Sequence, residues 1–301
     1  MDNTTNTKNI SLDKIWKSEE QGEGDGARVV RLISGSNNID TDPFLMFDYY
    51  NARLPGGFPD HPHRGFETIT YQLEGEMWHE DFKGHKGKIL PGGVQWMTAG
   101  KAIVHAEMPG SWTESAIGFQ LWINLSKENK MIEPAYQEFS KDQIPIYTDP
   151  TTKSTVKVIC GDFNDIKGPC QSKTPACYYD VGLNEDAEFN LPIGEDKNGY
   201  LFVYQGSITI DGKEIKTNYA GRFSPGKGNI LNVKCNKGGC GKFILMAAKP
   251  LKEPIKQMGP FVMNTEKELI QAYQDYQDSK NGFEGADTWN SEIKNMKYKK
   301  K

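Results

Sequence analysis

The sequence predicts an all-β fold made of two copies of one β-barrel module, followed by a short C-terminal helix. From about residue 16 to 250, short segments rich in Val, Ile, Tyr, Phe and Thr alternate with Gly, Pro, Asn and Asp. This texture is typical of strands joined by turns. A pattern recurs after about 130 residues, and helical spacing of apolar residues is confined to one segment near the C-terminus. Regular short strands of this kind form sandwiches, jelly rolls or barrels.

We predict strands in segments rich in β-branched and aromatic residues, whereas the residues before the first strand have a polar composition. Residues 1–15 are polar and rich in Asn and Thr, so we expect a flexible N-terminal arm. The clearest strand segments are Ala27–Ile33, Thr68–Leu73, Phe119–Asn124, Thr155–Ile159, Tyr200–Tyr204 and Phe243–Ala247.

The internal repeat defines the two modules. Tyr71-Gln-Leu-Glu-Gly75 is followed by Gly87-Lys-Ile-Leu-Pro91-Gly92 in the first half. Val203-Tyr-Gln-Gly206 is followed by Gly221-Arg-Phe-Ser-Pro225-Gly226 in the second half. Both halves therefore show a strand that ends in Gly, a hairpin, and a turn that opens the next strand. Two copies of one module explain this recurrence, and we expect domains at residues 16–140 and 141–301.

One C-terminal segment has helical signals. Thr265-Glu-Lys-Glu268 is a capping-box pattern, and Leu269, Tyr273 and Tyr276 follow at helical spacing. Asn281-Gly282 is a stop signal. We predict a helix at about residues 266–280 as part of the second domain. Its apolar stripe is expected to dock on a barrel, and the alternative is that it binds a partner.

Composition excludes several classes of function. The net charge is −4 and the isoelectric point is near 5.8, whereas nucleic-acid binding requires a basic surface. No apolar run is long enough to span a membrane, and the first residues lack the apolar stretch of a signal peptide. The chain is therefore not expected to be secreted. Free thiols in a reducing compartment are expected for the odd set of Cys160, Cys170, Cys177, Cys235 and Cys240.

Two pairs of metal-ligand residues carry the clearest functional signal. His61 and His63 form one pair, and His105 and Glu107 form the other. Residues two apart on a strand point to the same face, so each pair can direct both side chains at one point. Three imidazoles and a carboxylate suit a first-row metal ion and leave coordination positions open. No His follows residue 105, so we expect this site in the first module only.

The spacing of residues alone does not decide which carboxylate is the fourth ligand. Glu67 is four residues after His63 and lies on the same strand face, so Glu67 and Glu107 are both candidates. His79 and His85 fall in a hydrophilic hairpin, and we expect them to be exposed loop residues.

Several longer motifs resemble the pirin family over residues 10–295. They are Phe58-Pro-Asp-His-Pro-His-Arg-Gly-Phe-Glu67, Gln95-Trp-Met-Thr-Ala-Gly100, His105-Ala-Glu-Met-Pro109 and Gly259-Pro-Phe-Val-Met-Asn264. The resemblance implies a bicupin, with two jelly-roll-like cupin barrels and one Fe(II)/Fe(III) in the N-terminal barrel. It implies His61, His63, His105 and Glu107 as ligands, and leaves Glu67 to orient a ligand imidazole. Other divalent first-row ions also suit this ligand set.

Two functions follow from the resemblance. One is flavonol 2,3-dioxygenase activity on quercetin and dioxygen, with Glu107 as metal ligand and as the general base that takes the flavonol proton. The alternative is an iron-dependent, redox-sensing transcriptional co-regulator that binds NF-κB-type factors, with Arg28, Arg31 and Arg64 as weak candidates for the partner surface. We expect a monomer in the cytoplasm or nucleus. The expected substrate-pocket residues, which also suit a barrel core, are Phe58, Trp96, Met97, Phe119 and Gln120.

Overall fold

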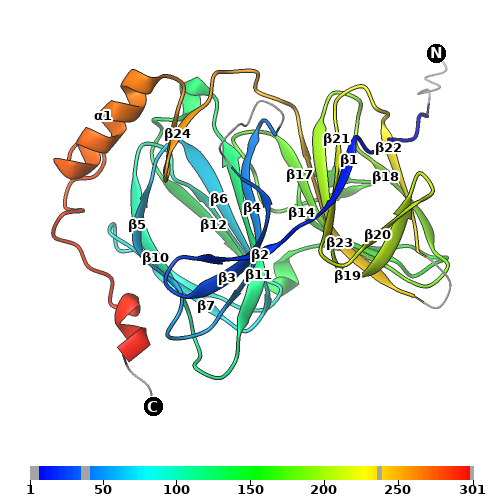
Figure 1. Cartoon of the computed structure of the whole chain (residues 1–301), viewed down its shortest axis with the longest axis horizontal. Helices are drawn as coiled ribbons and strands as arrows, with labels where there is room; N and C mark the ends of the chain where they lie inside the picture. Colours follow the sequence, from blue (N-terminus) through cyan, green and yellow to red (C-terminus); the bar gives the residue numbers. More distant parts are fainter. Residues whose placement is uncertain (1–6, 35–40, 236–238, 299–301) are drawn as a thin grey trace. The chain divides into compact units, whose positions relative to one another are not determined.

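The computed structural model describes residues 7–34, 41–235 and 239–298 (Figure 1). The chain divides into two compact units, each built on antiparallel strands. We call the first the N-terminal barrel, which contains Glu20–Gln143 and Leu251–Lys301. The second is the C-terminal barrel, which contains Met1–Glu19 and Ile144–Pro250. The predicted all-β class with two cupin domains is confirmed.

The N-terminal barrel consists of two main sheets within the described residues. One has seven strands in the order β12-β9-β6-β11-β4-β3-β2, and the other has four in the order β5-β10-β7-β8. Seven consecutive residues of β6 are buried, as expected for a central strand covered on both faces. The strands are β2 (Glu20–Glu23), β3 (Ala27–Ile33), β4 (Phe44–Ala52), β5 (Phe58–His63), β6 (Phe66–Glu74), β7 (Met77–Asp81), β8 (Lys86–Ile89), β9 (Val94–Thr98), β10 (Ile103–Pro109), β11 (Ala116–Asn124) and β12 (Ala135–Phe139).

The C-terminal barrel is one ten-stranded sheet in the part of the chain that the structure describes. Alternate residues of its central strands, such as Leu201 and Val203, form an apolar core with Phe243 and Leu245. A separate two-stranded ribbon joins β15 (Asp162–Phe163) to β16 (Ile166–Lys167). The main strands are β1 (Lys14–Lys17), β13 (Ile146–Thr148), β14 (Thr155–Cys160), β17 (Ala176–Leu183), β18 (Glu188–Pro192), β19 (Asn198–Ile210), β20 (Lys213–Lys216), β21 (Tyr219–Phe223), β22 (Ile230–Lys234) and β23 (Gly241–Ala248).

The repeated glycines take matching backbone conformations in the two barrels. Gly75 and Gly206 have φ of 66° and 69°, and Gly92 and Gly226 have φ of 81° and 82°. L side chains rarely adopt this left-handed region, so glycine is favoured there. A Cβ on Gly206 would also lie 1.8 Å from the carbonyl oxygen of Cys240. The sequence repeat therefore marks equivalent turns.

The described part of the N-terminal arm is ordered on the C-terminal barrel. Ile10 and Leu12 are buried, and the Ile10 amide donates a hydrogen bond of 2.7 Å to the carbonyl of Ile230. Strand β1 then pairs with β21. The expectation of a flexible arm over residues 1–15 is therefore wrong for residues 7–15, because two apolar side chains anchor them. Residues 1–6 lie outside the described residues.

The C-terminal segment packs on the N-terminal barrel. Helix α1 (Glu266–Gln277) begins with the predicted capping box, in which Thr265 and Glu268 exchange side-chain hydrogen bonds with each other's backbone amides. Leu269 and Ala272 of this helix pack with Val104 of β10. The ribbon of β24 (Lys256–Met258) and β25 (Phe261–Met263) precedes α1. The sequence predicts the helix as part of the second domain, but this apolar contact places it with the N-terminal barrel.

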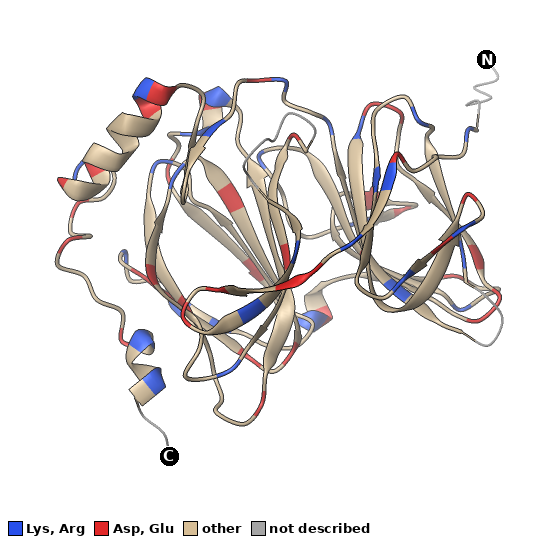
Figure 2. Cartoon of the chain, in the orientation of Figure 1, with Lys and Arg blue, Asp and Glu red and all other residues tan. Residues whose placement is uncertain are grey.

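Short helical turns complete the chain. Helix α1 ends before the predicted residue 280, because Ser279 adopts a left-handed φ of 51°. The other described turns are η2 (Lys127–Asn129), η3 (Lys141–Gln143) and η4 (Ile293–Tyr298). Over the described residues, no helix has the length and apolar character needed to cross a bilayer. Acidic and basic residues are interspersed along both barrels (Figure 2).

Candidate metal centre

Strands β5 and β10 bring the two predicted pairs of ligand residues together. The strands are antiparallel, and His105 lies directly opposite His61 in their register. Directly opposed residues project to the same face of a sheet. The register with β5 shifts between His105 and Glu107, because β5 advances three residues there while β10 advances two. Such irregularities re-aim side chains, and they are common beside functional sites.

The three imidazoles converge on one point. A ring nitrogen from each of His61, His63 and His105 lies within 4.8 Å of the others. The Nε2 atoms of His63 and His105 are 3.0 Å apart, and the ring centroids of His61 and His105 are 4.4 Å apart. Ligand atoms about 2.1 Å from one metal ion lie about 3 Å from each other. The separation between the two Nε2 atoms therefore suits a shared ion.

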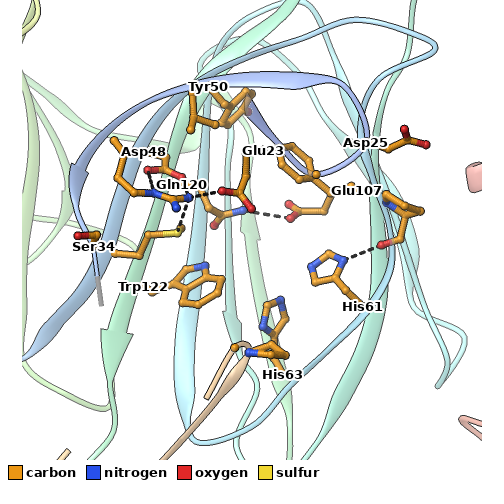
Figure 3. Close-up of a pocket in the computed structure, with 18 of the residues that line it drawn as sticks. Glu23, Asp25, Ser34, Asp48, Tyr50, His61, His63, Glu107, Gln120 and Trp122 are labelled. Atoms are coloured by element: carbon orange, nitrogen blue, oxygen red, sulfur yellow. Dashed lines mark hydrogen bonds and ion pairs between the residues drawn. The ribbon is translucent and has the colours of Figure 1, made fainter. Parts of the chain in front are cut away.

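The protonation of these imidazoles also fits a ligand role. Burial lowers the pKa of His63 and His105 well below the usual range, and the neighbouring His61 lowers them further. Both rings are therefore neutral at pH 7, the form that binds metals. The Nδ1 of His61 lies 2.8 Å from the carbonyl oxygen of Pro59 (Figure 3). A proton held on Nδ1 by that carbonyl leaves the Nε2 lone pair of His61 available.

Glu107 lies beside the imidazoles with both oxygens engaged. Its Oε1 accepts a 2.8 Å hydrogen bond from the Thr70 hydroxyl, and its Oε2 accepts one of 3.1 Å from Gln120 Nε2. Among the described residues, the group of mutually close ligand atoms contains the three imidazoles but not Glu107. The structure thus presents Glu107 as an oriented carboxylate next to the imidazole cluster.

Glu67 occupies a different position in the barrel. It lies on β6, is fully buried, and accepts a 2.8 Å hydrogen bond from the hydroxyl of Thr98 on β9. It too is outside the close group of ligand atoms within the described chain. The assignment of Glu107 rather than Glu67 as the fourth ligand therefore stays a proposal.

A cavity of about 750 Å³ opens beside the imidazoles. His61, His63 and Glu107 contribute to its wall, and Trp122 and Tyr50 lie around it (Figure 3). Ligand pockets in proteins typically measure about 300 to 1,000 Å³. The cavity can therefore hold a molecule of two or three fused or linked rings against the imidazole cluster.

The predicted pocket residues divide into two groups. Phe58 and Gln120 line the cavity. Trp96, Met97 and Phe119 are fully buried and do not appear in its wall, so these three follow the alternative reading as barrel core. Sequence reasoning missed Trp122, which lies within the predicted strand segment Phe119–Asn124. It also missed Gln257 and Pro260, which reach the cavity from the C-terminal segment. No local signal connects those two with His61.

Charged residues close one side of the cavity. Arg31 donates hydrogen bonds to Asp48, the shorter being 2.6 Å, and one of 2.7 Å to Glu23 (Figure 3). Arg31 is thus engaged in the cavity wall, and Arg64 is buried in an ion pair. Neither side chain is therefore available for the basic partner surface that the sequence suggested. Of the three candidates, Arg28 remains, and it forms an ion pair with Glu20.

The expectation for His79 is wrong. Its side chain lies on β7 and is only 2% exposed, while His85 is 35% exposed. Both rings lie close to the carboxylate of Glu138 on β12. The hydrophilic sequence around His79 predicts a loop. The side chain is buried because β12, which lies about 60 residues further along the chain, packs beside it.

Comparisons with known proteins agree with the fold. The pirin family model matches residues 26–123, and the model for the pirin C-terminal cupin domain matches residues 178–282. Pirin from Rattus norvegicus is 45% identical over 294 residues, covering 96% of this chain and 99% of its own. A pirin-like protein from Solanum lycopersicum is 45% identical over 90% of this chain and 92% of its own.

A solved structure is also similar. The crystal structure of quercetin 2,3-dioxygenase from Acinetobacter baumannii has a TM-score of 0.83 and 30% sequence identity, over 91% of this chain and 99% of that one. Two cupin barrels with a cluster of three imidazoles in one of them define a bicupin with a candidate metal centre. Identity over nearly the full length then specifies the family within that class, and the chain belongs to the pirin family.

Proposed function

We propose that this chain is a metal-dependent dioxygenase that acts on flavonols such as quercetin. The observation that carries the proposal is the convergence of three imidazoles, two of them held neutral by burial, at the wall of a 750 Å³ cavity. The similarity to a protein named quercetin 2,3-dioxygenase supports this choice of substrate. A flavonol has a flat aromatic body that carries polar oxygens, which suits a cavity whose wall combines apolar side chains with polar and charged ones.

His61, His63 and His105 would hold the metal, with Glu107 as the fourth ligand and iron as the ion. The Nε2 atoms of His63 and His105 face each other at 3.0 Å, and a proton on each buried Nδ1 would leave both Nε2 lone pairs for the ion. The bound ion would supply the polarisation of oxygen ligands and the electron transfer that dioxygen chemistry requires. Other divalent ions with a preference for imidazole also suit this set.

Glu107 would act as the general base that takes the proton from the flavonol hydroxyl. A base must lie within hydrogen-bond reach of the proton it removes, and Glu107 lies on the cavity wall. Thr70 and Gln120 fix its carboxylate through one hydrogen bond to each oxygen. Gln120 also donates to the Thr70 hydroxyl at 3.2 Å, so the three side chains form one positioning network.

The remaining wall would bind the flat substrate and limit the access of water. Phe58 and Trp122 offer aromatic surface on the cavity wall, and Val29 and Met77 add aliphatic surface. Aromatic rings stack favourably in offset or edge-on arrangements. The buried Tyr50 hydroxyl is hydrogen-bonded to Gln72, and burial followed by the charge of Glu107 raises the pKa of Tyr50 well above its usual value. Tyr50 would therefore remain a neutral wall residue.

The test is turnover by the iron-loaded full chain with quercetin and dioxygen. Loss of the flavonol absorbance and release of carbon monoxide would be followed together. His61→Ala should lower the rate by at least about 100-fold, since removing groups that only support ligands already costs 10- to 100-fold. Leu90→Ala removes an exposed side chain outside the cavity and should leave the rate unchanged. Equal rates for wild type and His61→Ala would overturn the proposal.

The co-regulator function implied by the resemblance stays a prediction. It requires that the affinity for a transcription factor differ between the Fe(II) and Fe(III) forms of the chain. Equal affinities of the two forms would exclude it.

A further inference from the structure

A second cluster of potential metal ligands lies in the N-terminal barrel. One ligand atom from each of His79, His85 and Glu138 lies within 4.8 Å of the others. The Oε1 of Glu138 is 2.8 Å from His79 Nε2 and 3.3 Å from His85 Nε2. All five His of the sequence therefore belong to one of two three-residue clusters.

The turn after β7 builds this cluster. Asp81 Oδ1 accepts hydrogen bonds of 2.9 and 2.8 Å from the amides of Lys83 and His85, which fold the turn back on the strand. Tyr136 donates a 2.9 Å hydrogen bond to the other Asp81 oxygen, and its ring stacks on the ring of His85 with centroids 4.1 Å apart. The partly exposed His85 ring is therefore held in place by the stacked Tyr136 ring and by the hydrogen bond of its own backbone amide.

Strand β12 brings the carboxylate to the two imidazoles. Tyr136 and Glu138 are two residues apart on β12, so they project to the same face. Gln95 Nε2 donates a 2.6 Å hydrogen bond to Glu138 Oε1 and fixes the carboxylate further.

The Nε2 of His79 is the atom that points to a ligand. It is buried and makes no hydrogen bond of normal geometry in the described chain, although Glu138 Oε1 is 2.8 Å away. Gly87 lies opposite His79 in the pairing of β7 with β8. A Cβ at Gly87 would lie 2.8 Å from this same Nε2. The absence of a side chain at position 87 thus keeps space beside the nitrogen.

We propose that His79, His85 and Glu138 form a second divalent-cation site, separate from the imidazole cluster of His61, His63 and His105. Two imidazoles and one carboxylate are a known ligand set for Zn²⁺, and imidazole ligands also suit Co²⁺ and Ni²⁺. The partly exposed His85 and Glu138 leave the site open to solvent, with water completing the coordination.

The three residues of this second site do not line the cavity beside His61 and His63. His79 lies directly opposite Glu107 in the pairing of β7 with β10, so the two sites are neighbours on one sheet. A cation there would link β7, the following turn and β12. The inference does not depend on the proposed dioxygenase activity, because it concerns ion binding alone.

The number of ions per chain tests the proposal. Metal-free full-length protein is dialysed against micromolar Co²⁺ or Zn²⁺, and bound metal is measured by elemental mass spectrometry. Wild type should hold two ions per chain. His85→Ala and His105→Ala should each hold one, and the double variant none. His85 is partly exposed, so its removal leaves the buried barrel residues in place.

Two glycine variants provide a matched comparison without removing a ligand. Gly87→Ala should weaken the second ion at least tenfold in competition with a chelator, because the new methyl group meets His79 Nε2. Gly22→Ala places its methyl group in open space and should leave both ions unchanged. One ion in wild type, or two ions retained in His85→Ala, would overturn the proposal. Either result would show that His85 does not bind a cation together with His79 and Glu138.

Discussion

The guanidinium of Arg64 donates a hydrogen bond of 2.7 Å to the carboxylate of Asp275, and both side chains are buried. Arg64 follows His63 directly at the end of β5, whereas Asp275 lies on α1, 211 residues further along the chain. The same guanidinium donates to the Asn281 carbonyl at 2.9 Å and lies over the ring of Phe283. These contacts join the C-terminal helix to the residue that directly follows His63 of the candidate metal centre.

Loss of this ion pair should destabilise the N-terminal barrel. Asp275→Ala leaves the Arg64 charge buried without its partner, which typically costs about 3–5 kcal/mol. The measurement is the free energy of unfolding by denaturant. Asp278→Ala removes a carboxylate that is 60% exposed just beyond the same helix and should cost much less. Equal losses for the two variants would mean that the buried pair contributes no more than an exposed charge.

The two buried glutamates should respond differently to amide substitution. Glu107→Gln removes the proposed ligand charge and should weaken iron binding at least tenfold, because a neutral amide is a poor ligand for iron. Glu67→Gln retains the acceptor for the Thr98 hydroxyl and should leave the metal bound. Chelator competition measures both affinities. Metal lost from Glu67→Gln but retained by Glu107→Gln would reverse the assignment.

A buried lysine should make stability depend on pH. Burial lowers the pKa of Lys130 to about 7, despite the attraction of Glu253 and other carboxylates. An unfolded lysine titrates near 10.4, so between pH 7 and 10 the unfolded chain binds more protons at this residue than the folded chain. Stability from this group therefore rises with pH over that interval, by up to about 1.4 kcal/mol per pH unit.

Lys130→Met isolates this contribution. The difference in unfolding free energy between wild type and Lys130→Met should shift in favour of wild type from pH 7 to pH 10. Wild type also keeps the hydrogen bonds of Lys130 Nζ to the Gly65 carbonyl at 2.9 Å and to Asn124 at 2.6 Å. A difference that stays constant with pH would show that Lys130 remains fully charged in the folded chain.

The capping box of α1 should contribute a measurable share of stability. Thr265→Ala removes the side-chain acceptor for the Glu268 amide and should cost about 1 kcal/mol. Lys267→Ala changes an exposed residue in the same turn and provides the comparison. Thermal unfolding followed by circular dichroism measures both. No difference between the two variants would contradict the role of the cap.

Features set by short stretches of sequence could be predicted. The spacing of His61 and His63 on one strand, and of His105 and Glu107 on another, depends only on the two-residue period of a strand. The cap at Thr265 depends on four consecutive residues. The matching turns at Gly92 and Gly226 depend on a glycine that adopts positive φ. Each of these features depends on a few neighbouring residues, so it can be predicted from the sequence without knowledge of the tertiary structure.

Features set by contacts between distant segments could not be predicted. His79 looked exposed because its neighbours in sequence are polar, but β12 covers it through Glu138. Trp96 looked like a pocket residue because aromatic side chains suit both a core and a cavity, and only the sheet register decides between them. The place of α1 was also misjudged, because chain order does not reveal that Asp275 pairs with Arg64.

The return of residues 251–301 to the N-terminal barrel has a consequence for biosynthesis. A ribosome makes Arg64 early but supplies Asp275 only after the whole of Ile144–Pro250 has been translated. Domains usually fold in the order in which they are made. Here the barrel that is translated first is completed last. A chain that terminates before Asp275 would contain His61, His63 and His105 but would lack the Arg64–Asp275 ion pair. We therefore expect stable assembly of the candidate metal centre only in full-length chains.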